Sequence, residues 1–171
     1  DELGRLPGVG RRRAGQLEPV AGEVRAEVPV RHLPQRLDVP WLGDPFGSYT
    51  GNPAGLPVDT HEIVGMIAPR GLLIMDNPHI DWLGAKSGSV AALGGAEIYK
   101  ALGAGENITY WSDVQDGTHC ANRSEWRGPI TQSIQKFMLG SGTAPGQFRI
   151  SGKKAGNLAE WRNWQTPTLT D

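Results

Sequence analysis

One histidine stands where it could transfer protons. His119 lies in the run Asp116-Gly117-Thr118-His119-Cys120, shortly after the apolar and aromatic run 108–112. An imidazole on a loop that follows a strand can reach into a site, take a proton from a nucleophile and return it to a leaving group. The residue types therefore make His119 the first candidate for a general base, and a solvated loop histidine is the alternative.

A carboxylate follows an earlier apolar run. Asp76 comes directly after Leu72-Leu73-Ile74-Met75. A carboxylate at the end of a strand can accept a hydrogen bond from a histidine, fix its tautomer and stabilise the imidazolium. Asp81 is a second candidate for this role. The alternative for Asp76 is a simple turn, because Asn77 and Pro78 follow it.

The elements that would position these groups alternate between strand and helix. The short apolar runs 72–75 and 108–112 are typical of strands buried on both faces of a parallel sheet. Between them, Ser89 is suited to start a helix that ends near Leu102. Gly94-Gly95 in its middle suggests that this helix lies close to the sheet.

Two further helices flank this unit. Asp59 and Glu62 form a capping-box pattern, which predicts a helix whose inward side chains are Ile63, Met66 and Ile67. The stretch 129–139 predicts the last helix, because apolar residues recur at helical spacing. They are Ile130, Ile134, Phe137 and Met138.

The order strand, acid, helix, strand, loop, histidine occurs in the last part of an α/β-hydrolase domain. We therefore expect an α/β fold, the C-terminal portion of an α/β-hydrolase with a mostly parallel sheet flanked by helices. The nucleophile elbow Gly-x-Ser-x-Gly does not occur in the sequence. Gly88-Ser89-Val90 comes nearest to it, but it lies between the acid and the histidine, which is the wrong chain order for this fold.

Composition divides the chain into three parts. Residues 1–40 are rich in Arg, Gly, Pro and Val without a lasting apolar period. We expect an irregular leader there, disordered or produced by a truncated or frameshifted reading. Residues 41–140 would be the C-terminal part of the α/β-hydrolase domain. Residues 141–171 read as a linker-like tail, in which Trp161 and Trp164 either dock back or begin a further segment.

Charge and ligand spacing exclude several partners. The formal net charge is −1, which does not favour nucleic acid, and no apolar run reaches the length of a membrane span. His61, His79 and His119 lack the spacing of a metal site. Cys120, the only cysteine, is either a small buried hydrophobe or half of a disulfide. Asn122-Arg123-Ser124 matches the glycosylation acceptor pattern.

Four stretches in this order and spacing resemble the C-terminal half of glucuronoyl esterases, the carbohydrate esterases of family 15. They are Leu56-Pro57-Val58-Asp59-Thr60-His61-Glu62, Ile67-Ala68-Pro69-Arg70-Gly71-Leu72, Ile80-Asp81-Trp82-Leu83-Gly84 and Gly117-Thr118-His119-Cys120. The resemblance covers about residues 45–140. It implies a secreted serine hydrolase that needs no cofactor or metal. It also implies a substrate, the ester that joins 4-O-methyl-glucuronic acid on xylan to lignin alcohols.

The resemblance also implies residue roles. His119 would be the triad histidine, Trp82 would lie at the glucuronoyl site, and Cys120 would pair with a cysteine beside the nucleophile. The family's nucleophile motif of the kind Gly-Cys-Ser-Arg-x-Gly is absent from this chain, as is its usual acidic residue. Members that place the acid after a later strand point to Asp76. We therefore expect the chain to be inactive alone.

Two other functions remain open at the level of sequence. A different xylan side-chain esterase of the same fold would share His119 and Asp76 but would not need Trp82. A non-catalytic polysaccharide-binding module would use exposed aromatic rings, for which Trp82, Trp111, Trp161 and Trp164 are candidates. Trp111 fits this role least, because it lies in an expected core strand.

Overall fold

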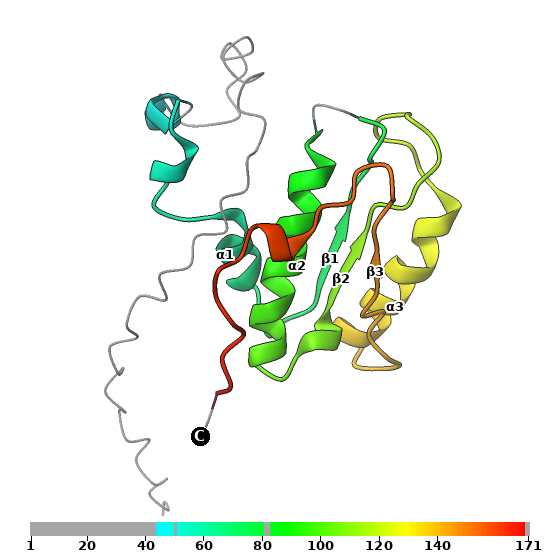
Figure 1. Ribbon diagram of the computed structural model, residues 1–171. Helices are drawn as coiled ribbons and strands as arrows, with labels where there is room; N and C mark the ends of the chain where they lie inside the picture. The colour runs from blue at the N-terminus through cyan, green and yellow to red at the C-terminus, as the bar shows by residue number, and fades with distance from the viewer. Residues whose placement is uncertain (1–43, 50, 81–82, 170–171) are drawn as a thin grey trace, which may run out of the picture.

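The computed structural model of the chain describes residues 44–49, 51–80 and 83–169 (Figure 1). The expectation for residues 1–40 therefore lies outside the described residues. A three-stranded parallel sheet forms the centre, with β1 (Leu72–Met75), β2 (Ile108–Trp111) and β3 (Phe148–Arg149) in that order. β1 and β2 confirm the two strands predicted from apolar runs.

The sheet is covered by helices on its two faces. α2 (Ala85–Ala101) connects β1 to β2 on one face, and α3 (Arg127–Phe137) connects β2 to β3 on the other (Figure 1). This is the layer arrangement that parallel strands require, because each crossover returns over a face of the sheet. The layered α/β architecture predicted from the order of elements is confirmed.

The first helix, α1 (Thr60–Gly65), begins as predicted but turns a different face inward. The Asp59 backbone N–H donates to Glu62 Oε2 at 2.8 Å, and the Asp59 side chain caps the helix in return. Ile63 and Met66 are 55% and 78% exposed, so the prediction that they face inward is wrong. His61 is buried instead, because α1 lies against α2.

The glycine pair of α2 explains this contact. A Cβ at Gly94 would lie 2.9 Å from the His61 Cβ, and one at Gly95 would overlap the Val64 side chain. The two glycines therefore allow α1 to approach α2; they do not serve contact with the sheet, as we had expected. α2 also begins at Ala85, after Gly84 at φ 67°, and Ser89 lies buried within its second turn.

The core lies between α2 and the sheet. Tyr99 and Ile108 are fully buried, with Ala104, Leu72 and Phe148 against them. Full burial of each large apolar side chain stabilises the fold by about 1.5–3 kcal/mol. On the other face, Phe137 of α3 lies directly over Gly71. α3 confirms the helix predicted over 129–139, but two of its regularly spaced apolar side chains, Ile134 and Met138, are 43% and 78% exposed.

The segment after residue 140 is not a simple linker. Its residues 148 and 149 form β3 beside β2, and the following chain crosses α2 (Figure 1). A strand of two residues has no detectable period, which is why composition alone suggested a linker. Three sets of contacts join the tail to α1 and α2: Gly156 N–H to Ser89 Oγ, Arg162 and Thr166 to Glu97, and the stacked rings of Trp164 and His61.

Candidate functional site

The candidate site lies where β1 and β2 end. Parallel strands bring their carboxyl ends to one edge of the sheet, and ligand sites of α/β folds form at that edge. The loop after β1 carries Asp76, and the loop after β2 carries His119. The fold therefore places the two sequence-predicted groups on neighbouring loops.

His119 is exposed on this loop, so a nucleophile or a substrate can approach its imidazole. Its Nδ1 lies 2.9 Å from the Sγ of the neighbouring Cys120, which is also exposed. Cys120 has φ 57°, the left-handed region that side chains other than glycine seldom adopt. The burial expected of Cys120 as a small hydrophobe is wrong, and its thiol is accessible to a partner cysteine.

The loop that carries His119 is fastened by a buried arginine. Arg123 donates through Nε and Nη2 to the two carboxylate oxygens of Asp116, at 3.1 and 2.9 Å. The same guanidinium donates to the carbonyl oxygens of Thr118 at 2.6 Å and Ala121 at 3.3 Å. Its hydrogen bonds, with a further one from the Thr118 N–H, hold the pKa of Asp116 below its usual value.

A second connection joins this loop to the end of β1. The Asn77 side-chain amide donates to the carbonyl oxygen of Asp116 at 3.0 Å. His79 Nε2 lies 3.0 Å from the Val114 carbonyl oxygen, and its Nδ1 lies 3.0 Å from Lys153 Nζ. The loops after β1 and β2 are therefore tied together at two places, which fixes the surroundings of His119.

Asp76 is engaged with the protein interior. Its Oδ2 accepts a hydrogen bond from the Tyr110 hydroxyl at 2.9 Å, and its Oδ1 accepts one from the Asn77 N–H at 2.7 Å. Tyr110 is fully buried, and burial, together with the Asp76 charge and this hydrogen bond, raises its pKa. Both oxygens of Asp76 thus have a partner other than His119. Its role as the triad acid stays a prediction.

Trp82 and Asp81 lie outside the described residues. Among the residues that are described, no group of three or more His, Cys, Asp or Glu side chains could hold a metal ion. Within the same residues no helix is long and apolar enough to cross a membrane.

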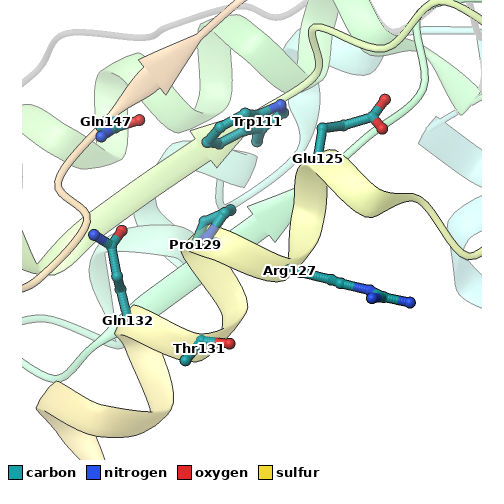
Figure 2. A pocket seen from close by; sticks show the side chains of 8 residues that line it. Trp111, Glu125, Arg127, Pro129, Thr131, Gln132 and Gln147 are labelled. Carbon is teal, nitrogen blue, oxygen red and sulfur yellow. The ribbon is translucent and has the colours of Figure 1, made fainter.

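A groove of about 490 Å³ lies apart from His119. Figure 2 shows it between the start of α3 and the Trp111 end of β2. Its lining residues are Trp111, Glu125, Arg127, Gly128, Pro129, Thr131, Gln132 and Gln147. His119 and Asp76 do not line it, so this groove is not the candidate catalytic site.

Sequence reasoning missed Arg123, Asn77 and Lys153. In the sequence, Arg123 stands out only as the middle residue of a glycosylation pattern. One signal was available, because Asp116 and Arg123 stand on either side of His119 within eight positions. An acidic and a basic residue that bracket a loop histidine are suited to close that loop by a charge-assisted pair.

Comparison with known proteins decides the family. The family model described as glucuronyl esterase of fungi matches residues 27–103, so residues 27–40 of the expected leader belong to the matched stretch. The 4-O-methyl-glucuronoyl methylesterase of Hypocrea jecorina is 36% identical over 131 residues, which cover 77% of this chain. The enzyme of that name from Podospora anserina is 37% identical over 133 residues, 75% of this chain. Over these residues the chain belongs to the glucuronoyl esterase family.

Solved structures agree with the sequence relatives. The glucuronoyl esterase catalytic domain of Hypocrea jecorina superposes with a TM-score of 0.68 at 34% identity, over 77% of this chain. This likeness confirms the predicted fold, part of an α/β-hydrolase domain. The chain spans 28% of the length of the Hypocrea jecorina relative and 35% of its solved domain. The chain therefore corresponds to about a third of the length of these glucuronoyl esterases.

Proposed function

We propose that this chain supplies the histidine-bearing part of a carboxylic ester hydrolase of the 4-O-methyl-glucuronoyl methylesterase type. The observation that carries the proposal is His119, exposed on the loop after β2 in a chain 34% identical to a glucuronoyl esterase domain. The enzyme is secreted and cleaves the ester that joins 4-O-methyl-glucuronic acid on xylan to lignin alcohols.

The chemistry assigned to His119 is proton transfer. Its imidazole takes the proton of a serine hydroxyl as that oxygen attacks the ester carbon, and returns it to the departing alcohol. Water then cleaves the acyl-enzyme with the same histidine as base. Because this sequence has no nucleophile elbow, the serine and its oxyanion hole belong to an upstream segment of the enzyme.

One observation supports the placement of the serine in an upstream segment, and a second supports the class of ester. Cys120 is exposed beside His119, as a disulfide with a cysteine near the nucleophile would require. A serine-to-alanine variant of the Sporotrichum thermophile glucuronoyl esterase, 31% identical to this chain, was solved with methyl 4-O-methyl-β-D-glucopyranuronate. We assign the same class of ester, a glucuronate ester, to the present chain, and Trp82 to the sugar-binding surface.

Substrate preference tests the proposal. The enzyme assembled from this chain and its upstream esterase segment should hydrolyse benzyl glucuronate well and acetylated or feruloylated xylan poorly. A preference for the uncharged sugar esters would replace the glucuronoyl assignment by that of another xylan side-chain esterase. Binding of xylan without hydrolysis of any ester would replace both by the polysaccharide-binding function.

A further inference from the structure

Arg123 is a buried cation in the loop that carries His119. Its side chain is 4% exposed, whereas that of its ion-pair partner Asp116 is 52% exposed. A buried guanidinium is tolerated only when its charge is paired and its N–H groups find acceptors. We define the Arg123 brace as Arg123 with its acceptors Asp116, Thr118 and Ala121.

The brace grips the backbone on both sides of His119. The carbonyl of Thr118, which accepts from Arg123 Nη2 at 2.6 Å, belongs to the peptide unit whose nitrogen is that of His119. The Thr118 N–H donates to Asp116 Oδ1 at 2.8 Å. Two residues beyond His119, the Ala121 carbonyl accepts from Arg123 Nη1 at 3.3 Å. The guanidinium therefore limits how far the backbone of His119 can turn.

The brace is anchored to rigid elements at two ends. The Arg123 guanidinium lies 4.8 Å from the ring centroid of Trp126, in the turn that leads into α3. Asp116 is held from the other side by the Asn77 amide at the end of β1. Hydrogen bonds and stacking on fixed elements are what a loop needs in order to present one side chain in one geometry.

We propose that Arg123 is a positioning residue for His119. It does not contact the reacting atoms; it holds the 116–121 backbone so that the imidazole keeps one orientation and one tautomer. The proposal deepens the proposed function and rests on it, since positioning matters only if His119 transfers protons. Loss of the brace should lower kcat with little change in KM.

The chain contains a matched control. Arg149 also pairs with an aspartate, Asp113 at 2.9 Å, and also lies over a tryptophan, 4.7 Å from the Trp111 centroid. Its side chain is 50% exposed and donates to Asp113 Oδ2, which lies outside the 116–121 backbone. Arg149→Ala thus removes an Arg–Asp–Trp group of the same composition without loosening the His119 loop.

The first test measures His119 directly in the full chain, without any activity. The nitrogen resonances of the ring are assigned with His119→Gln. A single tautomer keeps its two ring-nitrogen shifts far apart, and exchange between tautomers brings them together. The difference between the two ring-nitrogen shifts of His119 should become smaller in Arg123→Ala and should decrease less in Asp116→Asn. It should stay unchanged in Arg149→Ala. An unchanged separation in folded Arg123→Ala would overturn the proposal.

The milder variants keep the test valid if Arg123→Ala does not fold. Arg123→Lys keeps the charge but offers no bidentate fork, and Asp116→Asn keeps the shape of the partner. At least one of them must narrow the separation of the His119 shifts, and Asp113→Asn must not. If both behave like the wild type, Arg123 contributes only to folding and the positioning role is wrong.

The second test uses the enzyme assembled with its upstream segment. Arg123→Ala should lower kcat by roughly a hundredfold, the size expected when a reacting group is misplaced by about 1 Å. Arg149→Ala should stay within about twofold of the wild type. If the separation of the His119 ring-nitrogen shifts narrows in Arg123→Ala but the assembled wild-type enzyme hydrolyses no ester, the proposed function is wrong and the positioning role of Arg123 stands. Full activity of Arg123→Ala would contradict the positioning role of Arg123 and leave the proposed function standing.

Discussion

His119 Nδ1 lies 2.9 Å from the Sγ of Cys120, the next residue in the chain. Adjacent side chains rarely meet in an extended backbone, because they point to opposite sides. The contact coincides with φ 57° at Cys120, which is the one positive φ reported for a residue other than glycine in the described part of the chain. The backbone at this point therefore departs from its preferred region while holding the candidate base beside a thiol.

The positive φ of Cys120 predicts an unusual response to glycine. Cys120→Gly should raise the free energy of unfolding by up to about 1 kcal/mol, and Cys120→Val should lower it by about 1–2 kcal/mol, because a branched Cβ resists the left-handed region. Urea denaturation measures both. Gln115→Gly in the same loop is the control and should be destabilising. If Cys120→Gly lowered the free energy of unfolding, the backbone at Cys120 would not be strained.

The close approach of α1 to α2 predicts that alanine is not tolerated at Gly95. Its Cβ would overlap the Val64 side chain, so Gly95→Ala should lower the free energy of unfolding by about 1–3 kcal/mol through overpacking. Gly128 in α3 has nothing within 4 Å of its ideal Cβ, and Gly128→Ala should stabilise the fold by about 0.5–1 kcal/mol. Equal effects of the two changes in thermal unfolding would refute the close contact.

The hydrogen bond between Tyr110 and Asp76 predicts that removing the Tyr110 hydroxyl destabilises the fold even though the aromatic ring still fills its place in the core. Tyr110→Phe keeps the ring but leaves Asp76 Oδ2 without its buried donor at 2.9 Å. The free energy of unfolding at pH 7 should fall by about 1–3 kcal/mol, as for a hydrogen bond to a charged group. If Tyr110→Phe is as stable as the wild type in urea, the bond contributes nothing to the fold.

The same pair predicts a change at alkaline pH. Burial raises the pKa of Tyr110 in the folded state, so the neutral phenol is bound more tightly there than in the unfolded chain. Its contribution is complete below the unfolded pKa of about 10 and is lost as pH rises towards the folded value. The stability difference between wild type and Tyr110→Phe should therefore shrink above about pH 10. If the stability difference between wild type and Tyr110→Phe grew with pH instead, the pKa of Tyr110 would be lowered in the folded state and not raised.

The ion pair in the His119 loop predicts a change at acid pH. The hydrogen bonds from Arg123 lower the pKa of Asp116, so its contribution is complete above the unfolded pKa of about 4 and is lost as pH falls through the lower, folded value. The difference in Tm between wild type and Asp116→Asn should be constant from about pH 5 to 7 and vanish at lower pH. A constant difference down to pH 2 would contradict the shift.

The parts of the fold that could be predicted from sequence are those with local signals. The apolar runs 72–75 and 108–112 and the capping box of Asp59 and Glu62 are such signals, and all three appear in the structure. β3 could not be predicted, because its two residues are specified by pairing with Tyr110 and Trp111 and by no pattern of their own.

The candidate site was predictable to a smaller extent. His119 could be found because a loop histidine after a strand is a local feature. Arg123 and Asn77 act through hydrogen bonds to the loop backbone, and a sequence does not show which carbonyl a side chain reaches. The inward face of α1 was missed for a related reason: close contact at Gly94 and Gly95 decided it, and the hydrophobicity of Ile63 and Met66 did not.

The most direct test of the central claim is hydrolysis of benzyl glucuronate by this chain assembled with its upstream esterase segment, beside its His119→Ala variant. The assembled enzyme should be active, each part alone should be inactive, and His119→Ala should lose roughly 10³-fold or more in kcat, as expected when a triad member is removed. Undiminished hydrolysis by His119→Ala would contradict the assignment of His119 as the general base of a glucuronoyl esterase.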